Sequence, residues 1–401
     1  MNTEYLLITL LLAVIAMLLY LLVRKLPQNK QYTAVNDIEI DQLLHRQPIQ
    51  INDSNIFEQV SGKRILITGA AGSIGSEIAR QLSKYHPGMV ILCDQAESAL
   101  YDIHLDMQER FHDVTIRTHL VSIRNVKRLR RVFAMYRPQF VFHAAAYKHV
   151  PMMENDPGEA ILTNVLGTMH VADLSVHYGV DKFVMISTDK AVNPTGIMGA
   201  SKRIAEIYVQ SLNNQQSGST RFMTTRFGNV MDSNGSVIPR FRKQIKAGGP
   251  VTVTHPEITR YFMTIPEAVQ LVLEAASIGK GGEVFVFDMG EPVRISDLAK
   301  NMIRLAGLKV DKDIKIVYTG LRPGEKLYEE LLNNREQLQA TNHNKIKIAS
   351  GFECDVVKLK FNIQHLANID HYTDREELIA RIRNIIPEFS IQTQPTSSHT
   401  D

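Results

Sequence analysis

The stretch Ile65-Leu-Ile-Thr-Gly69-Ala-Ala-Gly72-Ser-Ile-Gly75-Ser-Glu-Ile-Ala79 combines a short apolar run, three glycines and the start of an amphipathic segment. This order predicts a buried strand, a tight glycine turn and a helix. A pyrophosphate can approach the backbone of such a turn and lie against the N-terminus of the helix. The stretch therefore predicts a dinucleotide site, with contacts from Gly69, Ala71, Gly72, Ser73, Ile74 and Gly75.

Asp94 ends the next apolar run, nineteen residues beyond Gly75. A carboxylate at this place accepts hydrogen bonds from an adenosine ribose and repels a 2′-phosphate. The sequence therefore predicts NAD as the cofactor, with NADP less favoured. The alternative role of Asp94 is to cap the helix that follows it.

Two later segments supply further cofactor candidates. His143 is followed by Ala144, Ala145 and Ala146, and three small side chains after a buried strand let the chain pass close under a dinucleotide. Close packing alone explains these alanines equally well. Asn164 falls inside a predicted helix, where Asn is a poor helix former, and this favours a binding role over a solvent-facing one.

Short apolar runs alternate with longer segments from residue 63 onward, and this alternation predicts a parallel sheet covered by helices on both faces. The predicted strands are Arg64–Thr68, Met89–Asp94, Thr115–Leu120, Gln139–His143 and Lys182–Ser187. After Arg226 the pattern becomes irregular, which is typical of a separate lobe. The fold class is therefore α/β, a Rossmann-type doubly wound sheet with a smaller C-terminal lobe.

The first residues form an apolar segment that predicts a membrane anchor. Residues 5–23 carry no charge, and as a helix of about 1.5 Å per residue they approach the ~30 Å hydrocarbon core. Glu4 precedes this run and Arg24 and Lys25 follow it, which disfavours a cleaved signal peptide and places the C-terminal side in the cytoplasm. A buried or partner-binding helix is the alternative. We expect a single-pass protein of the inner (cytoplasmic) membrane with its catalytic part in the cytoplasm.

The expected organisation follows from these patterns. The chain divides into a transmembrane anchor (1–25), a polar tether with one short helix (26–60), an NAD-binding part with the catalytic residues (61–225), a mainly substrate-binding lobe (226–390) and a Ser/Thr-rich disordered tail (391–401).

Composition narrows the classes of function. The chain has 401 residues, two cysteines and a formal net charge of +3, so neither a disulfide framework nor a nucleic-acid footprint is expected. Its 14 histidines show no metal-ligand spacing, and no metal site is expected.

Thr188-Asp189-Lys190 follows a buried strand, and Met198-Gly-Ala-Ser-Lys202 comes eight residues later. At the carboxyl end of a strand beside a dinucleotide site, Asp189 and Lys190 form an acid and base pair that suits an elimination. The alternative is a turn and helix cap whose charges lie in water. Met198 has a thioether, which neither gives nor takes a proton.

Residues 62–332 resemble the extended short-chain dehydrogenase/reductase group. Within this group they most resemble the polysaccharide-biosynthesis UDP-sugar 4,6-dehydratases. The membrane-associated branch of these enzymes also has Met in the place of the catalytic Tyr. The motifs that carry the resemblance are His143-Ala-Ala-Ala-Tyr-Lys-His-Val-Pro151 with Glu154, Ser187-Thr-Asp-Lys-Ala191, Met198-Gly-Ala-Ser-Lys202, Arg226-Phe-Gly-Asn229, Gly235-Ser-Val-Ile-Pro239, Thr259-Arg-Tyr-Phe-Met-Thr264 and Arg322-Pro-Gly-Glu-Lys326.

The resemblance implies dehydration of UDP-N-acetylglucosamine, or a similar UDP-N-acetylhexosamine, to a UDP-4-keto-6-deoxy sugar for surface polysaccharide. Asp189 would give a proton to the leaving 6-hydroxyl, and Lys190, with a lowered pKa, would take the C5 proton. Thr188 would bind the 4-oxygen and Lys202 the nicotinamide ribose. With Met198 in the place of Tyr, the acceptor of the 4-hydroxyl proton stays open.

Residues in the later motifs are expected to bind the UDP-sugar. Arginine grips a diphosphate with two hydrogen bonds, and loop residues at the carboxyl edge of a parallel sheet commonly contact ligands. The substrate candidates are Arg260, Arg322, Asn229, Ser236, Val237, Glu325, Lys148 and His149.

Two other functions remain open alongside the dehydratase. A UDP-sugar 4-epimerase shares the fold and the cofactor but does not need the Asp-Lys pair. A non-catalytic, membrane-tethered NAD-binding protein is consistent with the missing Tyr. A homo-oligomer is expected for the enzymes.

Overall fold

The computed structural model describes residues 12–17, 49, 51–213, 219–333, 336–349, 354–369 and 374–391. Residues 12–17 are helical and exposed. Within the described ranges, no helix is both long enough and apolar enough to cross a membrane. Most of the predicted anchor (1–25), most of the tether (26–60) and nearly all of the predicted tail (391–401) lie outside these ranges.

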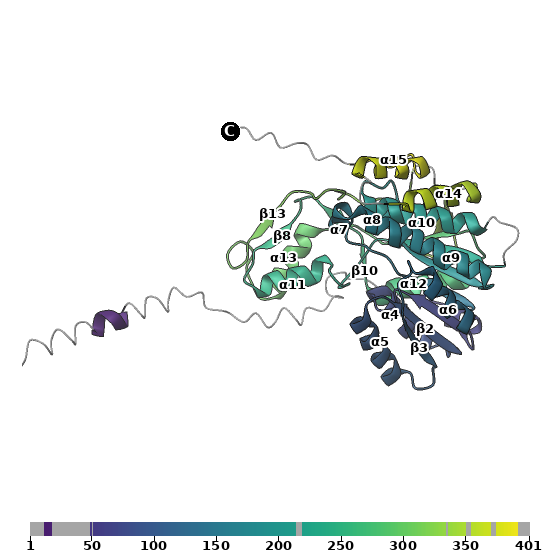
Figure 1. The fold of residues 1–401 in the computed structure, drawn as a ribbon. Helices are drawn as coiled ribbons and strands as arrows, with labels where there is room; N and C mark the ends of the chain where they lie inside the picture. Colours follow the sequence, from purple (N-terminus) through teal and green to yellow (C-terminus); the bar gives the residue numbers. More distant parts are fainter. Residues whose placement is uncertain are drawn as a thin grey trace, which may run out of the picture.

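A nine-stranded sheet forms the centre of the molecule, in the order β14-β15-β11-β6-β5-β4-β1-β2-β3 (Figure 1). Seven of these strands, from β3 to β11, pair in parallel, and β15 and β14 add an antiparallel edge. The strands are β1 Arg64–Thr68, β2 Met89–Asp94, β3 Ile116–Leu120, β4 Phe140–His143, β5 Lys182–Thr188, β6 Arg221–Phe227, β11 Val284–Phe287, β14 Leu338–Ala340 and β15 Ile346–Ala349.

The five predicted strands all occur, and each has bounds within one residue of the prediction at either end. The inner strands β1, β2, β4 and β5 are apolar along nearly their whole length and buried on both faces, as parallel strands are. The strand order reverses at β1, which pairs with β2 on one side and β4 on the other. This reversal opens a crevice at the carboxyl ends of the strands, which is where ligands bind in such sheets.

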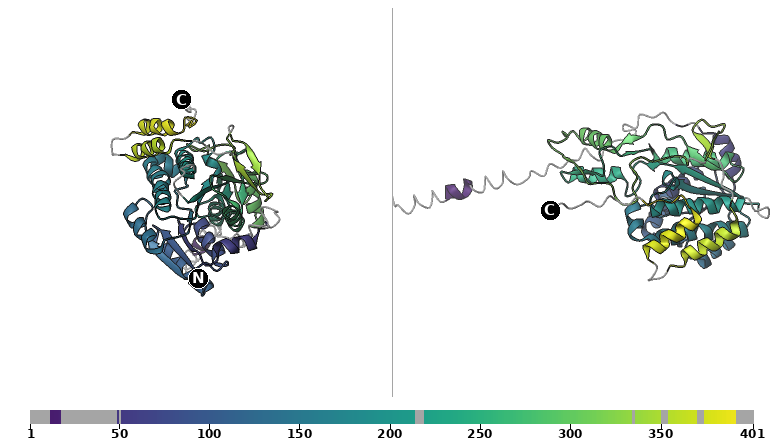
Figure 2. Two further views of the ribbon diagram at one scale, coloured as in Figure 1. Left: turned by 90° about the vertical axis from the view of Figure 1, so that its right-hand side faces the viewer. Right: turned by 90° about the horizontal axis from the view of Figure 1, so that it is seen from above.

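Helices cover both faces of the sheet through two separate apolar cores. On one face lie α3 Asp53–Val60, α4 Ser73–Ser83, α5 Glu97–Arg110 and α12 Ile265–Ile278. On the other lie α6 Val126–Tyr136, η2 Ile161–Gly167, α9 Thr168–His177, α10 Ile197–Asn213, α14 Val356–Ala367 and α15 Arg375–Ile385, which Figure 2 shows from two further sides.

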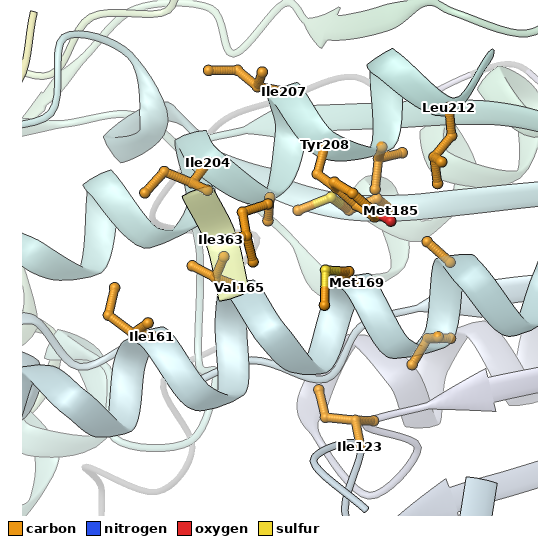
Figure 3. Packing of buried hydrophobic residues seen from close by; sticks show 14 of the residues in the cluster. Ile123, Ile161, Val165, Met169, Met185, Ile204, Ile207, Tyr208, Leu212 and Ile363 are labelled. Atoms are coloured by element: carbon orange, nitrogen blue, oxygen red, sulfur yellow. The ribbon is translucent and has the colours of Figure 1, made fainter. Parts of the chain in front are cut away.

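The helix α10 is central to the second core. Nearly all of its residues are buried, because it packs on the sheet, on η2 and α9, and under α14. Figure 3 shows Ile204 and Tyr208 of α10 facing Val165 and Met169, with Ile363 of α14 beside them. This packing fixes the start of α10, which carries Met198 and Lys202, against the end of β5.

A smaller lobe lies beside the carboxyl ends of the strands (Figure 1). Its core joins α11 Val237–Lys246 and α13 Ile295–Leu305 to the short strands β8 Val251–Val253 and β13 Ile316–Tyr318. The remaining short strands are β7 Asn229–Val230, β9 Thr259–Arg260, β10 Phe262–Met263 and β12 Val293–Arg294.

The expected division at residue 226 does not match this arrangement. The chain leaves the main sheet after β6, returns to it for α12 and β11, and returns again for β14, β15 and the two last helices. The smaller lobe is therefore built from insertions between elements of the main domain, because β11 and β15 complete the central sheet.

The helix α3 is the one short helix expected in the tether, and it belongs to the folded body. Ile56 and Val60 are buried against α12. The Asn55 amide donates to the Ser277 hydroxyl over 3.0 Å, and the Asn52 N–H donates to the Glu274 carboxylate over 3.0 Å. The end of the tether is thus held to the face of the sheet that α12 covers.

Candidate active site

A cavity of about 600 Å³ lies at the carboxyl ends of the strands, between the main sheet and the smaller lobe. Its walls come from the glycine turn after β1, the loop after β4, the end of β5, the start of α10 and several segments of the lobe. The predicted site residues on these walls are Gly69, Gly72, Ser73, Ile74, Gly75, Ala144, Ala146, Lys148, His149, Thr188, Lys190, Met198, Lys202, Asn229, Ser236, Val237, Arg260, Arg322 and Glu325.

The glycine turn has the close contacts that its sequence predicts. Gly69 has a φ of +69°, and a Cβ there would lie 2.5 Å from the backbone nitrogen of Ala145. A Cβ on Gly75 would lie 2.1 Å from the carbonyl oxygen of Gly69. The helix α4 begins directly after this turn, with Gly72 as its N-cap and no capping side chain. The backbone N–H groups at the start of α4 are therefore available to an anion such as a pyrophosphate.

Asp94 holds this turn in place. One carboxylate oxygen accepts the Ala71 N–H over 3.0 Å, and the other accepts the Ala96 N–H over 2.9 Å just before α5. Ala71 does not line the cavity. Asp94 does not cap α5, whose N-cap is Ala96 without a capping side chain, and its carboxylate can still accept further hydrogen bonds from a ribose.

A buried polar network lies beneath the cavity. The His143 ring contacts the Thr68 hydroxyl at 2.7 Å and the Thr168 hydroxyl at 2.9 Å, and burial lowers its pKa to about 3. The imidazole is therefore neutral at physiological pH, so the network carries no charge of its own.

Asn164 extends this network, and its predicted contact with the cofactor stays a prediction. Its carbonyl accepts the Tyr147 N–H over 2.8 Å, and its amide donates to the Tyr147 carbonyl and the Ser201 hydroxyl, each over 2.9 Å. The side chain is fully buried and outside the cavity wall. Ala145 also lies outside that wall. Asn164 fixes the loop after β4 to α10.

Thr188, Asp189 and Lys190 come together at the end of β5, where Asp189 begins the single 3₁₀ turn η3 (Asp189–Ala191). The Thr188 hydroxyl and the Lys190 ammonium both donate to the same oxygen of Asp189, each over 2.9 Å. Asp189 is completely buried and lies behind the cavity wall, so the alternative of charges lying in water is excluded for it. Its other carboxylate oxygen has no hydrogen-bond partner within the described chain.

Lys190 is charged in this site, and the expected lowering of its pKa was wrong. Burial by itself would lower the pKa, but the carboxylates of Asp189 and Glu329 outweigh burial and raise it. Lys190 also donates to the Asn229 side-chain carbonyl over 2.9 Å. The resting site therefore holds an ammonium, and a base role for Lys190 requires that it first lose a proton.

Glu329 is a site residue that sequence reasoning missed. One of its oxygens lies 3.5 Å from Lys190 Nζ and 3.6 Å from Arg260 Nε, and its side chain is 2% exposed. Glu329 lines the cavity and lies three residues after the Arg322-Pro-Gly-Glu-Lys326 motif. Its closeness in sequence to this motif was the one signal that could have pointed to it.

Two side chains of α10 face the cavity, as expected. Lys202 donates to the Ile186 carbonyl over 2.7 Å, and burial lowers its pKa to about 8. Met198 is buried where the resemblance places a Tyr, and its thioether offers no proton.

The two candidate arginines have different environments. Arg260 is buried, and its guanidinium donates to the carbonyls of Thr259 and Lys326 over 2.7 and 2.9 Å. Arg260 also lines the cavity, so its expected grip on a diphosphate stays a prediction. Arg322 has a side chain that is 46% exposed and pairs with Glu325 at the cavity edge, which leaves it accessible to a ligand.

The start of α11 forms the opposite wall of the cavity. Ser236 is the N-cap of this helix and has no capping side-chain bond, so the N–H groups of its first turn point to open space. The N–H of Asn234 donates to the Ser73 hydroxyl over 3.2 Å, so this loop touches the glycine turn. Arg240, one turn into α11, also lines the cavity and was not predicted. A helix N-terminus with an arginine nearby suits a phosphate group.

Fold and site together define an extended short-chain dehydrogenase/reductase architecture with a carboxylate and ammonium pair at its cavity. The model of a family described as "Polysaccharide biosynthesis protein" matches residues 65–351. The chain belongs to this family.

Many known proteins are similar to the chain, including the following three. The capsular polysaccharide biosynthesis protein CapD of Staphylococcus aureus is 54% identical over 75% of this chain, which spans 50% of CapD. A UDP-glucose 4-epimerase of Rickettsia rickettsii is 37% identical, over 69% of this chain and 80% of the epimerase. The solved structure of Pen from Bacillus thuringiensis is 34% identical with a TM-score of 0.67, and covers 76% of this chain and 98% of Pen.

Proposed function

We propose that the protein dehydrates UDP-N-acetylglucosamine, or a similar UDP-N-acetylhexosamine, to a UDP-4-keto-6-deoxy sugar in surface polysaccharide biosynthesis. The observation that carries this proposal is the pair of Asp189 and Lys190 at the end of β5, with an unpartnered oxygen on buried Asp189. An elimination needs one group that gives a proton and another that takes one, and the pair supplies both. Membership of a polysaccharide biosynthesis family supports the same assignment.

The cavity fits a bound dinucleotide by its geometry. A Cβ at Gly69 or Gly75 would collide with backbone, and the N-terminus of α4 faces the same space. Gly72, Ser73 and Ile74 would hold the pyrophosphate, and Lys202 the nicotinamide ribose. When bound, NAD accepts hydride from C4 of the sugar and returns it to C6.

The roles of the protein side chains follow from their places. Thr188 would hold the 4-oxygen. Transfer of a proton from the Lys190 ammonium to Asp189, along their 2.9 Å hydrogen bond, would make Asp189 the acid that protonates the leaving 6-hydroxyl and would leave Lys190 neutral. Lys190 would take the proton from C5, which is acidic once C4 is a ketone. Arg322, Arg240 and the N-terminus of α11 would hold the diphosphate, since their donors face the cavity.

The direct test is incubation of the full chain with NAD and UDP-N-acetylglucosamine, followed by mass measurement of the sugar nucleotide. A product lighter by one water supports the dehydratase. A control without enzyme accounts for spontaneous loss. Unchanged mass, with or without a change in stereochemistry, contradicts it.

A UDP-sugar 4-epimerase is the second candidate, favoured by the similarity to the Rickettsia rickettsii epimerase. An epimerase releases a sugar of unchanged mass with inverted C4, so chromatography of the product separates the two activities. A non-catalytic NAD-binding protein would bind the dinucleotide and leave the mass and the stereochemistry of the UDP-sugar unchanged.

The apolar N-terminal segment supports a location at the cytoplasmic face of the inner membrane, with one helix as the anchor. Deletion of residues 1–30 should give a protein that no longer fractionates with membranes and keeps its turnover within about twofold. The physical reason is that every site residue lies beyond residue 62. Loss of nucleotide binding in the truncated protein would contradict a simple anchor. Light scattering on the same sample tests the expected homo-oligomer.

A further inference from the structure

Residues Arg322–Glu325 form a tight turn at the edge of the cavity. The Glu325 N–H donates to the Arg322 carbonyl over 3.0 Å, and Gly324 at the third position has a φ of +72°. A proline at the second position, here Pro323, and a positive φ at the third are typical of a type II turn. Arg322 and Glu325, at the two ends of the turn, line the cavity. The place of this turn therefore sets where Arg322 meets a diphosphate.

The turn rests on the carboxylate of Glu154, which comes from α7 (Val150–Asn155). The Glu154 side chain is 5% exposed and lies outside the wall of the cavity. One of its oxygens accepts the N–H of Ile197, the first residue of α10, over 2.7 Å. A Cβ on Gly196 or on Gly324 would lie 2.7 Å from this same oxygen. The carboxylate therefore joins the loop before α10 to the corner of the turn.

Arg375, the first residue of α15, balances the charge of Glu154. Its guanidinium donates to the second oxygen of Glu154 and, over 2.6 Å, to the Glu154 backbone carbonyl. In the part of the chain that the structure describes, no other cation pairs with Glu154. Removal of the cation from a buried ion pair leaves an uncompensated charge, which is strongly unfavourable. Arg375 is therefore needed to keep the Glu154 carboxylate in its place.

We propose that Glu154 and its counter-ion Arg375 are positioning residues for the UDP-sugar: they hold the Arg322–Glu325 turn against the start of α10. This inference rests on the proposed function for the identity of the ligand. Neither side chain lines the cavity, so both act through Gly324 and Ile197. The helix α15 thus contributes to the affinity for a diphosphate that it does not touch.

The cofactor side of the cavity is held by other contacts. Asp94 holds the glycine turn through the Ala71 N–H, and Asn164 holds the loop after β4 through the Tyr147 N–H. Neither contact involves Glu154 or Arg375. A loss of affinity for UDP without a loss of affinity for NAD therefore distinguishes a displaced turn from general damage to the fold.

The first test is Arg375→Met in the full chain, with UDP binding measured by calorimetry at saturating NAD. The dissociation constant for UDP should rise about tenfold and that for NAD should change by less than about twofold, because only the support of the Arg322 turn is lost. Arg375→Lys, which keeps a cation, should restore part of the UDP affinity. In turnover assays the same loss should appear in KM more than in kcat.

A double variant tests whether the charge of Glu154 is what Arg375 serves. Glu154→Gln combined with Arg375→Met leaves an amide that still accepts the Ile197 N–H and needs no counter-ion. The double variant should therefore bind UDP more tightly than Arg375→Met alone, as coupled residues do in a double-mutant cycle. Additive losses in the two variants would overturn the pairing.

The matched control is Arg383→Met, which removes the same charge from the same helix at a residue that contacts the Phe389 carbonyl. Its affinity for UDP should equal that of the native chain. An equal loss in Arg383→Met would show that the helix charge in general is responsible. Native UDP affinity in Arg375→Met, or equal losses for UDP and NAD, would also overturn the inference.

Chemical rescue supplies a second measurement. Arg375 and Glu154 line a separate cavity of about 730 Å³, so a guanidinium ion can reach the carboxylate in Arg375→Ala. Millimolar guanidinium should raise the UDP affinity of this variant, whereas sodium chloride at the same ionic strength should not. A UDP affinity that guanidinium leaves unchanged would overturn the role of Arg375 as counter-ion.

These outcomes separate the two proposals. If the variants change UDP affinity as expected while the native chain removes no water from the sugar nucleotide, the dehydratase is rejected and the positioning role stands. If the native chain dehydrates the sugar while Arg375→Met binds UDP like the native chain, only the positioning role is rejected. A native chain that binds NAD but no UDP would overturn both.

Discussion

Two buried clusters of carboxylates and cations lie near each other and differ in one respect. In the first, Glu206 of α10 and Glu336 surround Arg226 of β6. In the second, Asp189 and Glu329 surround Lys190. Both place two acids around one base in the interior of the protein.

The Arg226 cluster is fully satisfied by hydrogen bonds. The guanidinium donates to both oxygens of Glu206 over 3.1 and 2.8 Å and to both oxygens of Glu336 over 2.8 and 3.2 Å. Although burial opposes the charge of Glu206, Arg226 and Arg203 outweigh it and lower the Glu206 pKa to about 2. Planar, two-point pairing of this kind suits a structural role.

The Lys190 cluster leaves one oxygen of Asp189 and one of Glu329 without a partner within the described chain. Unpaired buried oxygens cost stability, and they persist where a ligand or a moving proton will use them. The hydrogen-bonded charges of the Arg226 cluster hold α10 to β6, whereas the incompletely hydrogen-bonded charges of the Lys190 cluster lie where we propose the reaction takes place. Changes in the Arg226 cluster should therefore lower stability more than turnover. Changes in the Lys190 cluster should lower turnover more than stability.

The largest effect is expected from Lys190→Met. Turnover should fall roughly 10²–10⁴-fold, because no group remains to take the C5 proton. Solvent deuterium should no longer enter C5, as read by mass spectrometry of the sugar. Asp189→Asn, its companion, should still oxidise C4 and accumulate absorbance of the reduced cofactor. Native turnover in both variants would refute the assigned roles.

Arg226→Met should have the next largest effect, on stability. The change leaves buried Glu206 and Glu336 with Arg203 as their remaining shared partner, and breaking the buried pairs with Arg226 costs about 3–5 kcal/mol. Urea unfolding followed by circular dichroism measures this loss. Lys190→Met is the comparison and should shift the midpoint less, because Lys190 makes one short hydrogen bond to a carboxylate where Arg226 makes four. Equal losses in the two variants would abolish the distinction between the clusters.

A fall in pH should lower the stability that the Arg226 cluster contributes, by a smaller amount than Arg226→Met. The Glu206 pKa is about 2 against an ordinary 4.5, so its contribution is present above pH 4.5 and is lost as the pH falls toward 2. Between pH 5.5 and pH 3.5 the native chain should lose about 1 kcal/mol more stability than Glu206→Gln, which has no carboxyl there. Parallel losses, measured by urea unfolding at both pH values, would show that the pKa of Glu206 is not lowered in the folded state.

The smallest effect concerns the cofactor and lies outside both clusters. NAD should bind better than NADP, and Asp94→Ala should narrow the difference by about 1 kcal/mol because the 2′-phosphate is no longer repelled. Calorimetry with each dinucleotide gives the two affinities. Part of any loss in NAD affinity will come from the freed Ala71 N–H, which Asp94 accepts. Tighter NADP binding by the native chain would refute the assignment.

The sequence predicted the parts of the molecule that rest on local patterns. Apolar runs with flanking glycines located β1, β2 and β4 to within one residue, since a buried parallel strand must be apolar on both faces. The Gly69 turn was predictable for the same local reason. Thr188, Asp189 and Lys190 were located because they directly follow a recognisable strand.

Other features depended on contacts between distant segments. No predicted strand or glycine turn adjoins Glu329, so no local pattern indicated a role for it. It lies near Lys190 only because the chain after the lobe folds back over the cavity. Arg260 donates to the carbonyl of Lys326, 66 residues further along the chain, and no local pattern predicts this contact. The hydrogen bonds from the Asn164 amide to Tyr147 and Ser201 also join distant segments.

The sequence by itself determined the dinucleotide turn, the order of the first strands and the presence of an acid beside a base. Only the tertiary structure decided the charge of that base. Burial would make Lys190 neutral, and the carboxylates of Asp189 and Glu329 keep it charged, so the sign of its pKa shift depends on distances that no local pattern contains.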